Sequence, residues 1–316
     1  MITTPTIPFV STMNESDENV WLQALSKLMP DETILPLRML NDQARQLVDI
    51  AIVANPDPEE LQTLPNLVWV HSVWAGVEKI LQSPVTHNFS IVRLVDPKLS
   101  QTMAEAVLAW TLYLHRDMPE YAAQQAKAVW QPLPYITASE RTVGVLGLGE
   151  LGKEAALLLA KLGFNVIAWS RSQKTIDQIE TFSTSEGLDR ILGRSDILIC
   201  LLPHTPATEN LLSFENLSKL KPGAKLINFA RGRIIDDEAL LYDLNRGHIQ
   251  HAVLDVFAYE PLPVSHTFWT HPKVTVLPHI SAPTTVQSAS EIVAQNVRNY
   301  RHLRVLPDTV NTQLGY

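Results

Sequence analysis

The sequence predicts an α/β protein with two doubly wound domains, each built on a parallel sheet. The chain has 316 residues, whereas a single hydrophobic core stops growing at roughly 250–300 residues. Short apolar runs alternate with helix-like segments in two separate stretches, a pattern typical of parallel sheets with crossover helices. A glycine-rich loop stands between a strand and a helix near the middle of the chain. These observations together indicate two α/β domains rather than one.

The composition is that of a globular protein, with 46% hydrophobic and 18% charged residues. The net charge of −8 gives no general attraction to nucleic acid or anionic lipid. The first ten residues lack the pattern of a signal peptide, and the longest apolar stretch, near 106–114, is shorter than the roughly 20 residues of a membrane span. We therefore expect a cytoplasmic protein that binds neither nucleic acid nor membranes.

The first hundred residues carry the first series of elements. Buried strands are expected at 49–54, 67–70 and 91–95, with helices at 59–64 and 77–81. The segment 103–116 is apolar almost all round, which predicts a helix buried on every side, between two domains or between two subunits. A more exposed helix is expected at 122–128.

The second series runs from residue 141 to about 279 and predicts a doubly wound sheet. Its six expected strands are 142–146, 165–169, 196–202, 224–229, 251–255 and 274–277. The single cysteine, Cys200, lies within the third of these strands and is interpreted as a buried strand residue rather than a catalytic thiol. The last part, 288–304, has apolar residues near helical spacing and is expected to be a helix.

The glycine-rich loop follows the strand at 142–146 and opens a helix over 150–162. Its glycines, Gly147, Gly149 and Gly152, have the G-x-G-x-x-G spacing, and Glu150 and Leu151 start the helix. The first glycine permits a tight turn, the second lets a pyrophosphate approach the backbone, and the third lets helix and strand pack closely. The helix N-terminus offers free N–H groups to the phosphates. The sequence therefore predicts a dinucleotide site here, and we assign no metal site to the chain.

The strand at 165–169 ends in Ser170, Arg171, Ser172 and Lys174, where an acidic residue would hold the ribose of NAD. No carboxylate stands in this turn, so a 2′-phosphate would meet no repulsion. Arg171 could bind it through two donors, and Lys174 adds a second positive charge. The alternative is a solvated surface turn. We predict NADPH as the cofactor, with NADH binding more weakly.

Three segments that closely follow predicted strands carry candidate catalytic residues. They contain Arg231, Glu260 and His279. The carboxyl ends of the strands in such a sheet border the site where ligands bind. A histidine suits proton transfer, a nearby carboxylate keeps it charged, and an arginine can bind a carboxylate and polarise a carbonyl. This set has the groups needed to reduce a 2-keto acid with a bound cofactor.

With these motifs the chain resembles the D-isomer-specific 2-hydroxyacid dehydrogenases, and in detail the glyoxylate/hydroxypyruvate reductase A branch, over nearly its whole length. The segments 130–132 and 310–316 support that branch. The resemblance implies that Arg231, Glu260 and His279 are catalytic and that Asp255 holds the nicotinamide carboxamide. It also implies that the segment 202–208, with Leu202, Pro203 and Thr208, lies along the cofactor, and that Ala230 is a further cofactor-binding residue.

The resemblance further places the substrate carboxylate at the backbone N–H groups of Ala75 and Gly76. Here the sequence departs from the family pattern, because Trp74 replaces a glycine. Its indole either packs between the domains or narrows the substrate pocket, which leaves open the choice among glyoxylate, hydroxypyruvate and larger keto acids.

The resemblance implies a Rossmann-type nucleotide domain at 102–284, inserted into a flavodoxin-like substrate domain at 1–101 and 285–316. The active site would lie in the cleft between them, and the helix at 103–116 would help to form a homodimer. The expected activity is NADPH-dependent reduction of small 2-keto acids. Two alternatives stay open: another D-2-hydroxyacid dehydrogenase acting on a larger keto acid, and a non-catalytic dinucleotide sensor that binds partner proteins.

Overall fold

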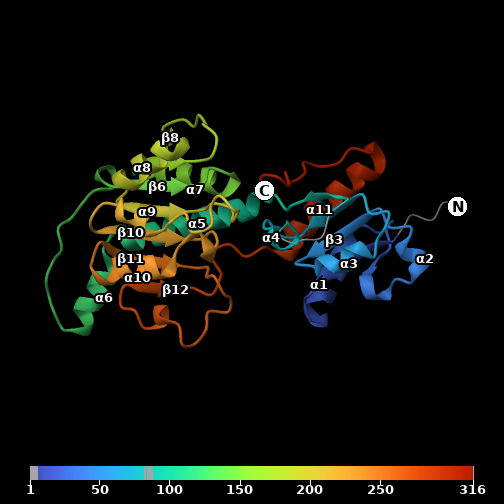
Figure 1. The fold of residues 1–316 in the computed structure, drawn as a ribbon, viewed down its shortest axis with the longest axis horizontal. Coiled ribbons are helices and arrows are strands. Elements are labelled where there is room, and N and C mark those ends of the chain that lie inside the picture. Colours follow the sequence, from blue (N-terminus) through green and yellow to red (C-terminus); the bar gives the residue numbers. More distant parts are fainter. Residues whose placement is uncertain (1–5, 82, 84–87, 316) are drawn as a thin grey trace. The chain divides into compact units, whose positions relative to one another are not determined.

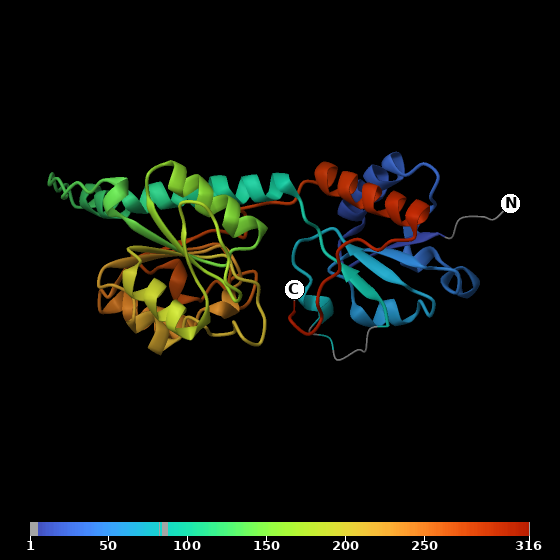
Figure 2. The ribbon, with the colours of Figure 1, turned by 90° about the horizontal axis from the view of Figure 1, so that it is seen from above.

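The structure is a computed structural model that describes residues 6–81, 83 and 88–315. The chain divides into two compact units, shown in Figures 1 and 2. Unit 1 consists of Met1–Lys98 and Thr284–Tyr316, and unit 2 consists of Leu99–Pro283. Each unit holds one parallel sheet covered by helices on both faces, so the predicted fold class is confirmed.

Unit 1 contains a five-stranded parallel sheet in the order β2-β1-β3-β4-β5. Its strands are β1 (Ile7–Ser11), β2 (Ile34–Pro36), β3 (Ile50–Ala54), β4 (Trp69–Ser72) and β5 (Ser90–Val92). This order is the doubly wound arrangement of flavodoxin-like folds.

Two helices far apart in the sequence share one face of this sheet. They are α1 (Glu15–Leu28) and α11 (Val286–Leu303), which lie side by side on the sheet (Figure 2). Their apolar side chains pack against those of the sheet. The other face is covered by shorter helices. These are α2 (Asp42–Arg45), α3 (Pro58–Gln62) and α4 (Glu78–Leu81), with the 3-10 turn η1 (Leu37–Met39). Helix α11 thus completes the core of a unit whose strands come from the beginning of the chain.

Unit 2 contains a seven-stranded parallel sheet in the order β12-β11-β10-β9-β6-β7-β8. Its strands are β6 (Thr142–Leu146), β7 (Asn165–Trp169), β8 (Glu180–Phe182), β9 (Ile197–Cys200), β10 (Ala224–Asn228), β11 (Ile249–Leu254) and β12 (Val274–Val276). Strands β7 and β8 are added on one side of β6, and β9 to β12 on the other. The strand order thus reverses between β6 and β9, which is the topological switch point where doubly wound sheets bind their ligands.

The two faces of this sheet are covered by different helices. Helices α5 (Pro97–His115) and α7 (Glu150–Lys161) cover one face, and α8 (Thr184–Arg194), α9 (Phe214–Ser218) and α10 (Asp237–Asn245) cover the other. Helix α6 (Met118–Ala126) follows α5. The remaining 3-10 turns are η2 (Ala138–Glu140), η3 (Gly232–Ile234) and η4 (Thr267–Trp269). Cys200 is fully buried in β9, as predicted, and burial raises the pKa of its thiol to about 12.

Within the single chain, helix α5 is buried on one face only. One face, including Met103 and Val107, is buried against the sheet, whereas Leu112 is 39% exposed within the single chain. A sheet covers only one side of a helix, so the apolar residues on the opposite side remain uncovered by this chain.

Other elements were assigned incompletely from the sequence. The strands β1, β2 and β8 and helix α1 were not assigned, and the second sheet has seven strands rather than six. Strand β4 begins two residues later than expected and continues through His71 and Ser72, which are both buried. The expected strand stopped before these two polar residues, but hydrogen bonds satisfy the buried His71 ring inside the unit: His71 Nδ1 lies 2.9 Å from Ser72 O, and its Nε2 lies 2.9 Å from Asn296 Nδ2.

Candidate active site

Three neighbouring strands of unit 2 end close to the predicted catalytic residues. Arg231 follows β10 and caps the 3-10 turn η3, Glu260 lies in the loop after β11, and His279 lies just beyond β12. Parallel neighbours end at the same edge of a sheet, and the structure brings the three side chains within electrostatic reach of one another. Residues spread over 49 positions of the sequence therefore form one cluster.

His279 and Glu260 form a hydrogen-bonded pair at this edge. His279 Nδ1 lies 2.8 Å from Glu260 Oε2, and the backbone N–H of Phe257 donates to Oε1 of the same carboxylate at 2.9 Å. The carboxylate is thereby held at both oxygens. Because Nδ1 faces Glu260, Nε2 is the ring nitrogen on the opposite side, where it can exchange a proton with a ligand.

The pair shifts the pKa of both partners toward the charged forms. The hydrogen bond to Glu260 raises the pKa of His279, burial opposes this, the negative charges of Glu260 and Asp255 add to the rise, and Arg231 counters it. Burial alone would raise the pKa of Glu260, but the hydrogen bonds from His279 and Phe257 and the nearby positive charges bring it below its ordinary value. The geometry therefore favours an imidazolium beside a carboxylate.

The turn that carries Arg231 is fixed by a buried amide that sequence analysis did not assign. Asn228, 1% exposed, accepts a hydrogen bond from Ala230 N–H at 3.2 Å and donates to Arg231 O at 3.1 Å. Gly232 packs so closely on the chain after β11 that a Cβ there would lie 1.9 Å from the carbonyl carbon of Phe257. An amide residue at the end of a strand, directly after the apolar pair Leu226 and Ile227, was the available sequence signal for this role.

Asp255 lies directly after β11 and is 2% exposed. Its Oδ1 accepts a hydrogen bond from Ile280 N–H at 2.7 Å, and its Oδ2 accepts one from Ser281 N–H at 2.9 Å. The sequence expectation for Asp255 was contact with the cofactor. In the chain itself, its carboxylate holds the loop that carries His279.

The glycine-rich loop has the geometry that a dinucleotide requires. Gly147 has a φ of 103°, and a Cβ on Gly152 would lie 1.8 Å from Gly147 O, so both positions need glycine for the fold itself. Gly149, the N-cap of α7, is different, because a Cβ there would meet no described atom within 4 Å. The fold leaves open space at the point where a pyrophosphate would approach the backbone, so the loop fits the cofactor.

The turn after β7 brings a positive charge to this loop. Lys174 Nζ donates to Leu148 O, between two of the glycines, at 2.5 Å. Ser170 is 8% exposed and donates to Ser172 O at 2.8 Å, which closes the turn, and Arg171 and Ser172 are exposed. The predicted clamp residues thus form one compact turn, with a lysine amine at the glycine-rich loop.

The segment after β9, which contains Leu202 and Pro203, is folded on itself. Thr208 Oγ1 donates to Pro203 O at 2.7 Å and accepts from Thr205 N–H at 2.8 Å. Further along, Asn210 N–H donates to Arg233 O at 2.8 Å, which links this segment to the turn after Arg231.

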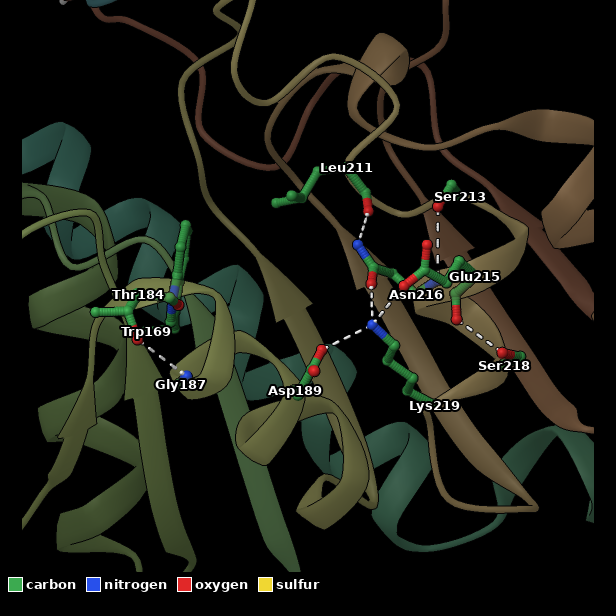
Figure 3. A network of polar contacts seen from close by, with 10 residues as sticks. All are labelled: Trp169, Thr184, Gly187, Asp189, Leu211, Ser213, Glu215, Asn216, Ser218 and Lys219. Atoms are coloured by element: carbon green, nitrogen blue, oxygen red, sulfur yellow. Dashed lines mark hydrogen bonds and ion pairs between the residues drawn. The ribbon is translucent and has the colours of Figure 1, made fainter.

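A polar network supports the far end of the same segment (Figure 3). Lys219 Nζ lies 2.8 Å from Asp189 Oδ1, 2.9 Å from Glu215 Oε1 and 3.1 Å from Asn216 Oδ1. Asn216 in turn donates to Leu211 O at 2.7 Å. The network ties α8 to α9 and holds the chain that follows the segment 202–208.

The predicted substrate loop lies in unit 1, after β4. The indole of Trp74 is partly buried and packs edge-on against Trp21 of that unit's core, with ring centroids 5.5 Å apart. Its backbone N–H donates to Ser72 Oγ at 3.0 Å, and none of the described residues accepts a hydrogen bond from its buried Nε1. Ala75 and Gly76 follow and are half-buried. Packing against Trp21 thus accounts for the position of Trp74 within unit 1.

No helix in the described part of the chain is long and apolar enough to cross a membrane. Residues 108–281 match the family model described as D-isomer specific 2-hydroxyacid dehydrogenase, NAD binding domain. The matched residues lie within unit 2 and include the glycine-rich loop and the three candidate catalytic residues.

Several known proteins are similar over almost the whole chain. Glyoxylate/hydroxypyruvate reductase A of Yersinia enterocolitica is 38% identical over 302 residues, 94% of this chain and 96% of that protein. The counterpart from Serratia proteamaculans is 36% identical over the same shares of the two chains.

Solved structures are similar as well. A D-isomer specific 2-hydroxyacid dehydrogenase of Xanthobacter autotrophicus Py2, in complex with NADPH and MES, has a TM-score of 0.91 at 34% identity and covers 98% of this chain and 100% of its own. The NADPH-dependent glyoxylate/hydroxypyruvate reductase of Sinorhizobium meliloti, in complex with NADP and sulfate, has a TM-score of 0.89 at 32% identity and covers 98% of this chain and 99% of its own. The chain therefore belongs to the D-isomer specific 2-hydroxyacid dehydrogenase family.

Proposed function

We propose that this protein reduces small 2-keto acids with NADPH, converting glyoxylate to glycolate and hydroxypyruvate to D-glycerate. The observation that carries the proposal is the hydrogen-bonded pair of His279 and Glu260, whose Nδ1 and Oε2 atoms lie 2.8 Å apart. The pair lies at one edge of the sheet of unit 2, within electrostatic reach of Arg231. The names of its relatives support this substrate class.

In this proposal unit 2 holds the cofactor, which supplies the hydride when bound. The loop Gly147–Gly152, with Glu150 and Leu151 opening α7, would hold the pyrophosphate, and the turn with Ser170, Arg171, Ser172 and Lys174 would hold the 2′-phosphate. Leu202, Pro203, Thr208, Ala230 and Asp255 would line the remainder of the cofactor. The absence of a carboxylate in that turn, and the NADPH and NADP in the solved relatives, favour NADPH over NADH.

The protein residues carry out the proton transfer and the binding of the substrate. The imidazolium of His279 gives its Nε2 proton to the carbonyl oxygen as the carbonyl carbon is reduced, and Glu260 stabilises the imidazolium through Nδ1. Arg231 binds the substrate carboxylate and polarises the carbonyl. We assign the backbone N–H groups of Ala75 and Gly76 to the same carboxylate, with Trp74 fixing their loop. The product is a 2-hydroxy acid, of D configuration where the carbon is chiral.

We further propose that the protein is a cytoplasmic homodimer that pairs through α5, α6 and the segment that follows them. This surface exposes several large apolar side chains close together, and exposed apolar patches of this kind mark interaction sites. They are Leu112, Met118, Tyr121, Val129, Trp130 and Tyr135, of which Trp130 is 98% exposed. Sedimentation of the wild type and of Leu112→Glu tests this, since the variant should sediment as a monomer.

The first experiment is to follow NADPH oxidation, and separately NADH oxidation, at the nicotinamide absorbance with glyoxylate, hydroxypyruvate and larger 2-keto acids. The proposal predicts turnover of the two small acids with NADPH well above NADH. Turnover of larger acids alone would assign the protein to another dehydrogenase of this family. NADPH binding without any turnover would make it a dinucleotide sensor.

A further inference from the structure

The carboxylate of Asp255 is fully committed to the chain that follows His279. Each of its oxygens accepts one of two consecutive backbone N–H groups, those of Ile280 and Ser281, at 2.7 and 2.9 Å. Hydrogen bonds to an ionised carboxylate are among the stronger ones in proteins. Asp255 is itself anchored, because its backbone N–H donates to Asn228 O on the neighbouring strand at 3.1 Å. The sheet thus reaches the histidine loop through one buried side chain.

His279 has a backbone conformation that needs such support. Its φ is 55°, in the left-handed region that residues other than glycine adopt uncommonly, although histidine is among those found there more often. Such a conformation persists only where neighbouring contacts determine it. The two hydrogen bonds to Asp255 fix the two successive peptide groups that follow His279, while Glu260 fixes its ring.

We propose that Asp255 is a positioning residue that holds the backbone of His279 in the conformation from which its imidazole meets Glu260. The inference rests on the proposed role of His279 as proton donor, and it gives Asp255 a task beyond contact with the cofactor. Two carboxylates on different segments then fix one histidine, Asp255 through the backbone and Glu260 through the ring.

The pKa of His279 provides a readout, because it depends on the charges around the ring. Loss of a contact between Asp255 and the cofactor alone would not change that pKa. Glu260 and Asp255 both favour the protonated ring, and Arg231 opposes it. Removing the charge of Asp255 therefore lowers the pKa of His279. Because reduction needs the protonated form, the pH at which reduction is lost should then fall.

The test is Asp255→Asn. Asparagine has the same shape but a single side-chain acceptor, so its NH₂ group would face one of the two backbone N–H donors. We expect kcat for reduction at saturating NADPH to fall on the order of 100-fold, the cost of a misplaced catalytic group. The pH limb of kcat should move to lower pH, with the dissociation constant of NADPH, from fluorescence titration, little changed.

The matched control is Asp243→Asn, in a second aspartate of unit 2 that is also 2% exposed and hydrogen-bonded to Arg246. It should leave kcat and the pH limb at their wild-type values. An Asp255→Asn enzyme with unchanged kcat and pH limb would overturn the proposal. Weaker NADPH binding with an unchanged kcat at saturation would make Asp255 a cofactor contact only.

Titration of the His279 ring by NMR separates this inference from the proposed function. A wild type that reduces no keto acid would overturn the function, whereas an identical His279 titration in wild type and Asp255→Asn would overturn the positioning role. Asp255→Glu serves if the asparagine variant does not fold. It keeps the negative charge but moves the carboxylate by one methylene. We therefore expect kcat to fall while the pKa of the His279 ring stays near its wild-type value. An unchanged kcat there would also contradict the proposal.

Discussion

The Nδ1 atom of His279 lies 2.8 Å from Oε2 of Glu260. This hydrogen bond orients the imidazole, and the negative carboxylate stabilises the protonated ring. Histidine and glutamate come from loops after two adjacent parallel strands, β12 and β11. The pair therefore depends on sheet order, because 18 residues separate the two in the sequence. The same pair sets the pH range in which the proposed reduction can proceed.

The Glu260→Gln variant tests this dependence on pH. The pKa of His279 is raised above its ordinary 6.5, so the ring is protonated below that raised pKa, and reduction should be lost as the pH rises through it. The amide removes the negative charge, so in the variant reduction should be lost at lower pH, with kcat reduced by about 10²–10⁴-fold. Oxidation of the hydroxy acid should show the opposite limb.

The measurement is kcat/KM for both directions between pH 5 and 9. Asp237→Asn provides the control, since it removes a carboxylate 3.7 Å from another histidine, His266, in the same unit. A Glu260→Gln profile that coincides with the wild-type profile would show that the pair does not govern the proton transfer.

The basic turn after β7 is expected to determine the preference for NADPH over NADH. Replacing Arg171 with aspartate removes two donors and places a negative charge where the 2′-phosphate is proposed to bind. Charged hydrogen bonds contribute about 1.5–3 kcal/mol, so the NADPH dissociation constant should rise roughly 10–100-fold, with NADH binding changed far less. Fluorescence titration measures both, and Arg190→Asp on α8 controls for the general change in charge. Equal losses for NADPH and NADH would contradict the clamp.

Two glycines of the same loop should respond differently to alanine. Gly152→Ala would place a Cβ 1.8 Å from Gly147 O, so the loop must shift, and we expect about 1–3 kcal/mol less stability together with weaker NADPH binding. Gly149→Ala meets no described atom within 4 Å, so it should fold normally and still lose about tenfold or more in NADPH affinity.

Urea unfolding and NADPH titration separate these two effects. Gly193→Ala in α8 is the control, because its Cβ would have ordinary contact only, 3.8 Å from Lys219 O. Full NADPH affinity in Gly149→Ala would mean that the pyrophosphate does not approach the backbone there.

Two buried histidines predict sensitivity to acid. Burial lowers the pKa of His71 in unit 1 and of His251 in unit 2 to about 4. The unfolded chain binds these protons near pH 6.5 and the folded chain does not, so stability should decline from about pH 6.5 down to about pH 4. Each pKa unit corresponds to about 1.4 kcal/mol, so each histidine should cost about 2 kcal/mol by pH 5.

Urea unfolding at pH 7.5 and pH 5.0 tests this expectation. His71→Gln should be less stable than the wild type at pH 7.5, because it disturbs the hydrogen bonds to Ser72 and Asn296, but it should lose less on acidification. An equal loss in both proteins would show that His71 does not cause the decline.

The sequence was most informative where residue type and local order coincide. Apolar runs gave β6 and β7 with their observed bounds, and the glycine spacing gave the loop before α7. Short or polar elements were missed. Strand β1 is buried from Ile7 to Val10 but includes Pro8, a residue that is uncommon inside strands, and β8 has three residues of which one is buried. Helix α1 has only a narrow buried face, which includes Trp21 and Leu25.

What the sequence by itself determined was the chemistry of the single positions: two α/β stretches, glycines before a helix, a basic turn without a carboxylate, and an arginine, a glutamate and a histidine after strands. Local backbone preferences and side-chain chemistry are properties of short segments, and a short segment displays them. The tertiary structure alone decided that Glu260 meets Nδ1 of the His279 ring, that Asn228 and Asp255 hold the turns that carry Arg231 and His279, and that Trp74 packs on Trp21. Most of these contacts join segments that are distant in the sequence, which meet only because of the order of strands in a sheet or the packing of a core. Strand order and core packing are set by burial of apolar surface in the whole unit, not by residues adjacent in the sequence.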